Sequence, residues 1–179
     1  MLPIRDDHPL RDLFAGVVEN TFHEQIGLCE PRLTDYLADL MVEFLHIDTL
    51  NVIRRAHGKR PEQVAAMLAM VCGERPESAE ERDCLMYRRI GDYSLFWSGL
   101  YPESLRRPRI RVGDLLLNYV EQGKHSYAAA ARLTTDDTEP PASLLQSLSE
   151  EFEACVHGLG LVRRSWEDCA GEGGGELVY

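Results

Sequence analysis

A stripe of apolar side chains at residues 33–45 constrains the fold of this chain more than any other feature. The apolar positions recur at intervals of three and four residues: Leu33, Tyr36, Leu37, Leu40, Met41, Phe44 and Leu45. With 3.6 residues per turn, this spacing gathers them on one face of a helix. Pro31 suits the first turn. We therefore predict an amphipathic helix over residues 31–45 that buries this face.

The same spacing recurs along most of the chain. It predicts further helical segments at residues 10–22, 48–58, 61–73, 76–100, 113–133 and 143–158. Gly123 leaves open whether the fifth of these continues or restarts, and Gly158 is predicted to end the last, before a short helical or extended piece. No stretch shows the sustained alternation that is typical of strands. The predicted fold class is all-α: a compact bundle of six or seven helices, with orthogonal or mixed packing and no significant sheet.

The length of 179 residues fits a single domain. We expect a helical domain over residues 1–168 and a flexible, Gly-rich acidic tail over 169–179. No apolar run approaches the roughly 18 residues that a membrane span needs. The first residues lack the apolar region of a signal peptide. These features predict a protein without a membrane partner.

The net charge of −11 argues against general binding to nucleic acids or anionic membranes. The number of cysteines is five, and no two of them have the CxxC spacing that is typical of zinc sites and disulfide frameworks. We therefore expect reduced thiols and a cytoplasmic location.

Motifs for nucleotide binding (GxGxxG, GxxxxGK[ST]) and hydrolysis (HExxH, GxSxG) are absent from the sequence. Catalytic residues and cofactors therefore stay unassigned, and the sequence leaves open whether the chain is an enzyme. Three carboxylate–histidine pairs have helical spacing: Glu19 with His23, Glu43 with His46, and Glu153 with His157. Such pairs supply metal ligands in di-iron helical bundles, but that architecture needs two ExxH units and here one matches. Surface pairs, or a core histidine satisfied by its neighbour, are the alternative.

The run GDYSLFWSGLYPE at residues 91–103 is the most aromatic part of the chain. Tyr93 and Trp97 continue the spacing of Ile90, while Phe96 falls on another flank, so this helix is apolar nearly all round. Such a helix is buried on most sides or contacts a partner. Core packing, a dimer interface and a ligand pocket all remain open. The candidate interface or pocket residues are Tyr93, Phe96, Trp97 and Tyr101.

Several stretches together carry a resemblance: HIDTLNVIR at 46–54, GKRPEQVAAML at 58–68, YRRIGDYSLFWSGLYPE at 87–103, YVEQGKHSY at 119–127 and FEACVHGLGLVRRSW at 152–166. They resemble a family of uncharacterised bacterial proteins of about this length. The resemblance implies a bacterial, cytoplasmic, single-domain protein and brings no site residues.

Two functional hypotheses follow from the sequence. The first is a non-enzymatic helical module that binds a protein partner or itself as a homodimer; it rests on the missing catalytic motifs, the aromatic run and the uneven charge. The alternative is a helical bundle with a buried metal or small-molecule site, and an oxidoreductase is one form of it.

Overall fold

The computed structural model describes residues 9–45, 76–105 and 112–172, together with Val64, Ala66, Met67, Ala69, Met70 and Gly73. These residues form six α-helices and no strand, which confirms the predicted class. The helices are α1 (Pro9–Thr21), α2 (Pro31–Leu45), α5 (Ala79–Leu100), α6 (Val112–Arg132), α7 (Ala142–Glu150) and α8 (Phe152–Glu172). The segment predicted at 48–58 lies outside the described residues, as does most of 61–73.

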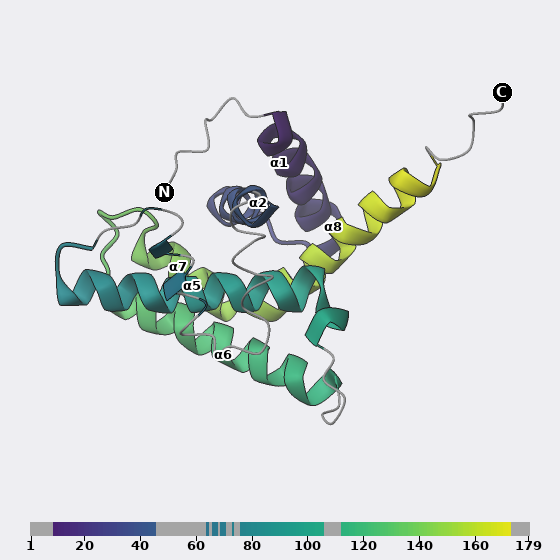
Figure 1. Ribbon diagram of the computed structural model, residues 1–179. Coiled ribbons are helices and arrows are strands. Elements are labelled where there is room, and N and C mark those ends of the chain that lie inside the picture. The colour runs from purple at the N-terminus through teal and green to yellow at the C-terminus, as the bar shows by residue number, and fades with distance from the viewer. Residues whose placement is uncertain are drawn as a thin grey trace.

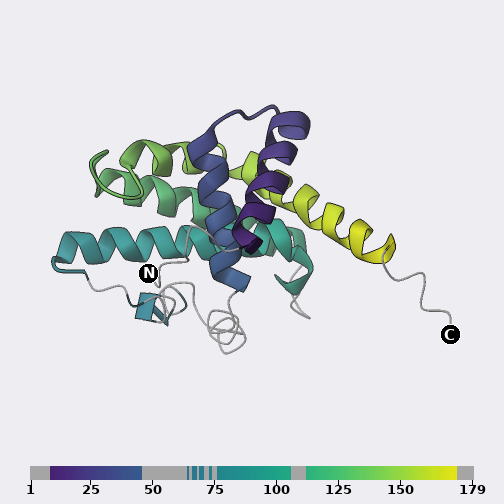
Figure 2. The ribbon, with the colours of Figure 1, turned by 90° about the horizontal axis from the view of Figure 1, so that it is seen from above.

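The helices pack in mixed directions (Figure 1). α5 and α6 lie side by side and make the most extensive contact between described helices. α2 is seen nearly end-on in Figure 1 and lengthwise in Figure 2, whereas α5 runs across both views, so α2 crosses α5 steeply. α1 packs along α2, and α8 passes beside α5 toward the C-terminus. The crossing of α2 over α5 brings side chains distant in sequence together.

Local signals place the starts and ends of these helices. α2 begins at Pro31, as predicted, and α5 ends at Leu100, just before Tyr101 and Pro102. Ser78 caps α5 by accepting a hydrogen bond from the Glu81 amide at 3.0 Å. The Glu81 carboxylate accepts from the amide of Glu77 at 2.7 Å, one residue before its partner in a standard capping box.

The predicted stripe of α2 forms one side of the core. Leu33, Leu37 and Met41 are fully buried, and Phe44 stacks on Phe96 of α5 with ring centroids 4.6 Å apart. The largest fully buried side chains come from several elements: Phe22, Phe44, Phe96, Tyr127 and Phe152. The core therefore joins α2, α5, α6, α8 and the short helical segment Phe22–Ile26 after α1, and burial of these rings supplies much of the driving force for folding.

Two glycines that the sequence suggested as helix boundaries lie inside helices. α6 continues through Gly123, and α8 continues through Gly158, which corrects the predicted end of a helix there. A Cβ atom at Gly158 would lie 2.3 Å from Cζ of Phe22, and one at Gly123 would lie 2.2 Å from Cζ of Phe152. Both glycines therefore make room for a buried ring.

The segment predicted as one helix from Ser143 is two helices that meet at Glu151. α8 then extends to Glu172, so residues 169–172 of the predicted tail are helical; residues 173–179 lie outside the described part of the chain. None of the described helices combines the length and apolar character needed to cross a membrane.

Candidate functional site

A carboxyl group buried at the crossing of three helices is the centre of the candidate site. Asp92 of α5 is 1% exposed. Its Oδ1 accepts a hydrogen bond from the hydroxyl of Tyr36 on α2 at 2.5 Å and another from the hydroxyl of Tyr127 on α6 at 2.8 Å. These two bonds tie α2, α5 and α6 together through one oxygen atom.

An arginine completes this group, and it carries its charge into the interior. Arg89 precedes Asp92 by one helical turn and is 2% exposed. Its Nη1 lies 2.5 Å from Oε1 of Glu43 on α2 and 3.4 Å from Oδ2 of Asp92. We refer to Tyr36, Glu43, Arg89, Asp92 and Tyr127 as the Asp92 cluster. A buried charge is tolerated when it is paired and hydrogen-bonded in this way.

The surroundings of the cluster change its proton affinities. Burial raises the pKa of the Asp92 carboxyl, although the positive charges of Arg89 and Arg88 oppose this change. The pKa of Tyr36 and of Tyr127 is raised well above the usual value, mainly by burial and secondly by the negative charge of Asp92. Both phenols therefore stay protonated at neutral pH and act as hydrogen-bond donors.

Helical spacing explains how the sequence brings these groups together. Tyr36, Leu40 and Glu43 are separated by four and three residues on α2, so they form one face that crosses α5. Arg88 and Asp92 are four residues apart on α5, so they share the opposing face. The Gly91 backbone lets the Tyr127 ring approach, because a Cβ there would lie 2.7 Å from Cε1 of that ring.

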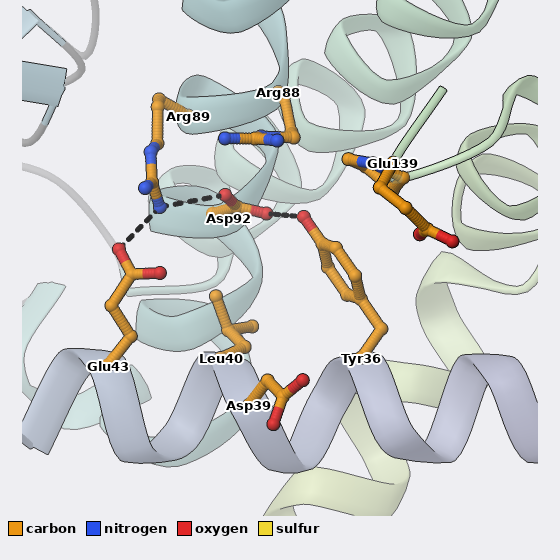
Figure 3. A pocket seen from close by; sticks show the side chains of 9 residues that line it. Tyr36, Asp39, Leu40, Glu43, Arg88, Arg89, Asp92 and Glu139 are labelled. Carbon is orange, nitrogen blue, oxygen red and sulfur yellow. Dashed lines mark hydrogen bonds and ion pairs between the residues drawn. The ribbon is translucent and has the colours of Figure 1, made fainter. Parts of the chain in front are cut away.

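A pocket of about 160 Å³ lies beside the cluster (Figure 3). We call it the α2–α5 pocket; α2, α5 and the loop before α7 form its walls. Its lining is Tyr36, Asp39, Leu40, Glu43, Arg88, Arg89, Asp92, Glu139 and Pro140. Figure 3 shows Asp92 between the two arginines of α5 and Tyr36 of α2. Four members of the Asp92 cluster, namely Tyr36, Glu43, Arg89 and Asp92, therefore line a space that can hold a small molecule.

A second pocket of about 280 Å³ adjoins the first. The two share Arg88, Glu139 and Pro140. The rest of its lining is mainly apolar or hydroxyl-bearing: Glu81, Cys84, Leu85, Leu133, Thr134, Thr135, Thr138 and Leu145. We call it the threonine pocket. Burial raises the pKa of the Cys84 thiol, so this group is protonated at neutral pH.

The four aromatic residues singled out from the sequence lie together at the end of α5. Phe96 is 1% exposed and Tyr93 is 7% exposed. Trp97 is partly buried between Phe96 and Tyr101, with ring centroids 5.8 Å and 6.0 Å away. Tyr101 also lies 5.1 Å beneath the guanidinium of Arg163 on α8. In the described part of the chain these rings therefore pack mainly on the protein's own helices.

The carboxylate–histidine pairs are distributed over separate places. Glu19 and His23 are exposed near the end of α1 and line a pocket of about 90 Å³. Glu43 binds Arg89, whereas Glu153 of α8 binds Lys124 at 2.7 Å. His157 is exposed, and His46 lies outside the described residues. No three His, Cys, Asp or Glu side chains within residues 9–45, 76–105 and 112–172 form a group that could hold a metal ion.

Spacing along the sequence does not single out Asp92, Arg89, Tyr36 or Tyr127 as site residues. A signal was present, because Asp92 is a charged residue within a helix that is apolar nearly all round. Its tyrosine partners lie 56 and 35 residues away in the chain, which spacing along a helix cannot reveal.

Comparisons of the chain with protein-family models, with curated proteins and with solved structures find no match. The resemblance to uncharacterised bacterial proteins thus remains an expectation from sequence. The geometry of the Asp92 cluster and the α2–α5 pocket is the basis for a functional proposal.

Proposed function

We propose that this protein binds a small polar molecule in the α2–α5 pocket. The observation that supports the proposal is the position of the buried Asp92 and Arg89 and the partly buried Glu43 on the wall of that pocket. Ionisable groups that are buried beside a cavity are frequent at binding and catalytic sites.

A purely structural role accounts less well for this arrangement. Apolar side chains of similar volume stabilise a helix crossing as well as a buried ion pair does, or better, because no charge must leave water. Here the cluster also borders a pocket rather than a completely filled interior. A binding role uses both features, since fixed polar groups orient a ligand without first having to be ordered.

The size of the space limits the ligand. About 160 Å³ corresponds to roughly five water molecules at about 30 Å³ each. This is below the roughly 300–1,000 Å³ of pockets for drug-sized ligands. A compact molecule, or one end of a longer molecule that also enters the threonine pocket, fits this limit.

An interaction module remains a separate prediction. Self-association as a homodimer, or binding of a protein partner, rests on the missing catalytic motifs, the uneven charge and the aromatic run, where Trp97 and Tyr101 retain exposed area. Bacterial origin and cytoplasmic location likewise remain predictions. The metal form of the alternative hypothesis has no support among the described residues, whereas the pocket supports its small-molecule form.

A fragment screen by NMR tests the proposal. We expect hits that move the backbone amide signals of Leu40 and Asp92 in the ¹⁵N-labelled protein. The Asp39→Trp variant places a large ring on the pocket wall and should abolish those shifts. Asp35→Trp makes the same change one helical turn earlier on α2, at an exposed position outside the lining, and should preserve them. Hits that bind elsewhere, or equally in both variants, would contradict the proposal.

A further inference from the structure

Resting on the proposed function, we infer that the ligand is a small organic cation with a hydrocarbon tail. Its ammonium group, or a similar group with N–H donors, lies among the carboxylates of the α2–α5 pocket. The tail extends past Arg88 into the threonine pocket. This assignment comes from the charge of the lining, the state of individual carboxylate oxygens and the composition of the second pocket.

The charge of the lining favours a cation. Four carboxylates line the α2–α5 pocket against two guanidinium groups, and Arg11 pairs with one of the four, Asp39, from outside the lining, which leaves a formal balance of −1. Arg89 already faces Glu43 and Asp92, so its charge is matched from within the site. The net charge of −11 on the chain acts in the same direction, because a negative field attracts cations toward a cleft.

Individual oxygen atoms show where a donor would be accepted. Asp92 accepts both tyrosine hydrogen bonds at Oδ1. Within the described chain, its Oδ2 has just the 3.4 Å contact with Nη1 of Arg89. The Asp92 side chain is 2% exposed, so the more open Asp39, with a side chain 35% exposed, is the acceptor that a ligand reaches first. Asp39 engages Arg11 through Oδ1. A carboxylate can accept about four hydrogen bonds, so the pocket offers acceptor oxygens to a ligand with N–H groups.

Glu139 adds a carboxylate at the junction of the two pockets. It is exposed, and no described side chain forms an ion pair with it. A cation at this point gains attraction without displacing an existing partner. Its position also marks the route from the α2–α5 pocket into the threonine pocket.

The threonine pocket suits the hydrocarbon part of such a ligand. Leu85, Leu133 and Leu145 contribute apolar side chains. Cys84 also lines this pocket, and its protonated thiol behaves as a small apolar group. A tail in this pocket would cover Cys84, which gives the protein an internal reporter of occupancy.

Three probes of equal chain length separate the contributions of charge and tail. They are n-pentylamine, pentan-1-ol and pentanoate, which carry a positive, a neutral and a negative head group. Each is titrated into the full chain by NMR, and the dissociation constant is obtained from the Leu40 and Asp92 amide shifts. Alkylation of Cys84 by iodoacetamide is followed in parallel by site-resolved mass spectrometry, with exposed Cys29 as the internal reference.

We expect n-pentylamine to bind at least tenfold more tightly than the other two probes and to slow alkylation of Cys84 but not of Cys29. Glu139→Gln should weaken n-pentylamine binding roughly two- to fivefold, as expected for loss of an exposed ion pair. Glu121→Gln, at an exposed glutamate of α6 outside both pockets, should leave it unchanged.

The outcomes distinguish this inference from the proposed function. Tighter binding of pentanoate or pentan-1-ol at Leu40 and Asp92 overturns the cation and leaves the binding pocket standing. Binding of n-pentylamine without protection of Cys84 overturns the placement of the tail. Failure of all three probes, while fragments still bind at the pocket, overturns the inference alone. Failure of every fragment and every probe overturns the proposed function with it.

Discussion

Replacing the Tyr127 hydroxyl tests the Asp92 cluster most selectively. Tyr127→Phe removes the hydrogen bond of 2.8 Å to Asp92 Oδ1 and retains the ring, which packs against Gly91 and lies 6.0 Å from the Phe152 ring. A hydrogen bond to a charged or buried acceptor contributes about 1.5–3 kcal/mol. We expect a loss of about 2 kcal/mol in the free energy of unfolding, because Tyr36 still donates to the same oxygen.

The double variant Tyr36→Phe/Tyr127→Phe sharpens this test. It leaves Asp92 Oδ1 buried without either phenol donor. The loss should therefore exceed the sum of the two single losses, by about 1 kcal/mol. Tyr87→Phe changes an exposed tyrosine of α5 and should stay within about 0.5 kcal/mol of the unmodified protein.

Urea unfolding followed by far-UV circular dichroism measures these differences. With a denaturant slope near 2 kcal/mol/M, the Tyr127→Phe loss moves the midpoint by about 1 M. Unchanged stability of Tyr127→Phe, or strict additivity in the double variant, would refute a shared hydrogen bond acceptor at the crossing of α2, α5 and α6.

Three further predictions concern a close-packed glycine, a helix cap and the pH dependence of stability. Gly91→Ala should lower the free energy of unfolding by about 1–3 kcal/mol in urea, because its Cβ would lie 2.7 Å from the Tyr127 ring, whereas Gly16→Ala has open space and should raise it by about 0.5–1 kcal/mol. Ser78→Ala should lower the free energy of unfolding in urea by about 1 kcal/mol, because α5 loses its N-cap hydrogen bond. The pKa of Asp92 is raised above the usual carboxyl value of about 3.8, so at a pH between the two values the folded protein binds a proton that the unfolded chain does not. The contribution of Asp92 to the free energy of unfolding therefore falls as the pH rises through the raised pKa. The free energy of unfolding, measured against Asp92→Asn from pH 4 to 8, should therefore decline with pH; an increase would contradict the assigned direction.

The helices were predictable because their signals are local. The stripe from Leu33 to Phe44 reports one face of one helix, and Pro31 marks its start, so the bounds of α2 follow from neighbouring residues. The apolar character of the aromatic run nearly all round its helix is likewise visible from neighbouring residues, and Tyr93, Phe96 and Leu100 are buried.

The glycines were less informative because the same residue serves two purposes. Gly158 and Gly123 resemble helix boundaries in sequence, since glycine weakens a helix by about 1 kcal/mol relative to alanine. In the structure they accept the rings of Phe22 and Phe152 from distant segments. A glycine that makes room for a ring cannot be distinguished from a helix end until the packing partner is known.

The candidate site depends still more on distant residues. Glu43 and His46 are a candidate metal-ligand pair, or a surface pair, because the two are close in sequence. The structure places its carboxylate against Arg89, 46 residues away. Asp92 likewise takes its partners from α2 and α6, so the cluster exists once three helices have packed.

The ¹³C signal of the Asp92 side-chain carboxyl tests the central claim most directly, because it reports on the atom at the centre of the proposed site. Addition of n-pentylamine to saturation should move this signal in the unmodified protein and leave it unmoved in Asp39→Trp, whose pocket is filled. Equal concentrations of pentanoate should have a much smaller effect. An Asp92 signal that is insensitive to n-pentylamine and to every fragment would show that the cluster stabilises the helix crossing without binding a ligand.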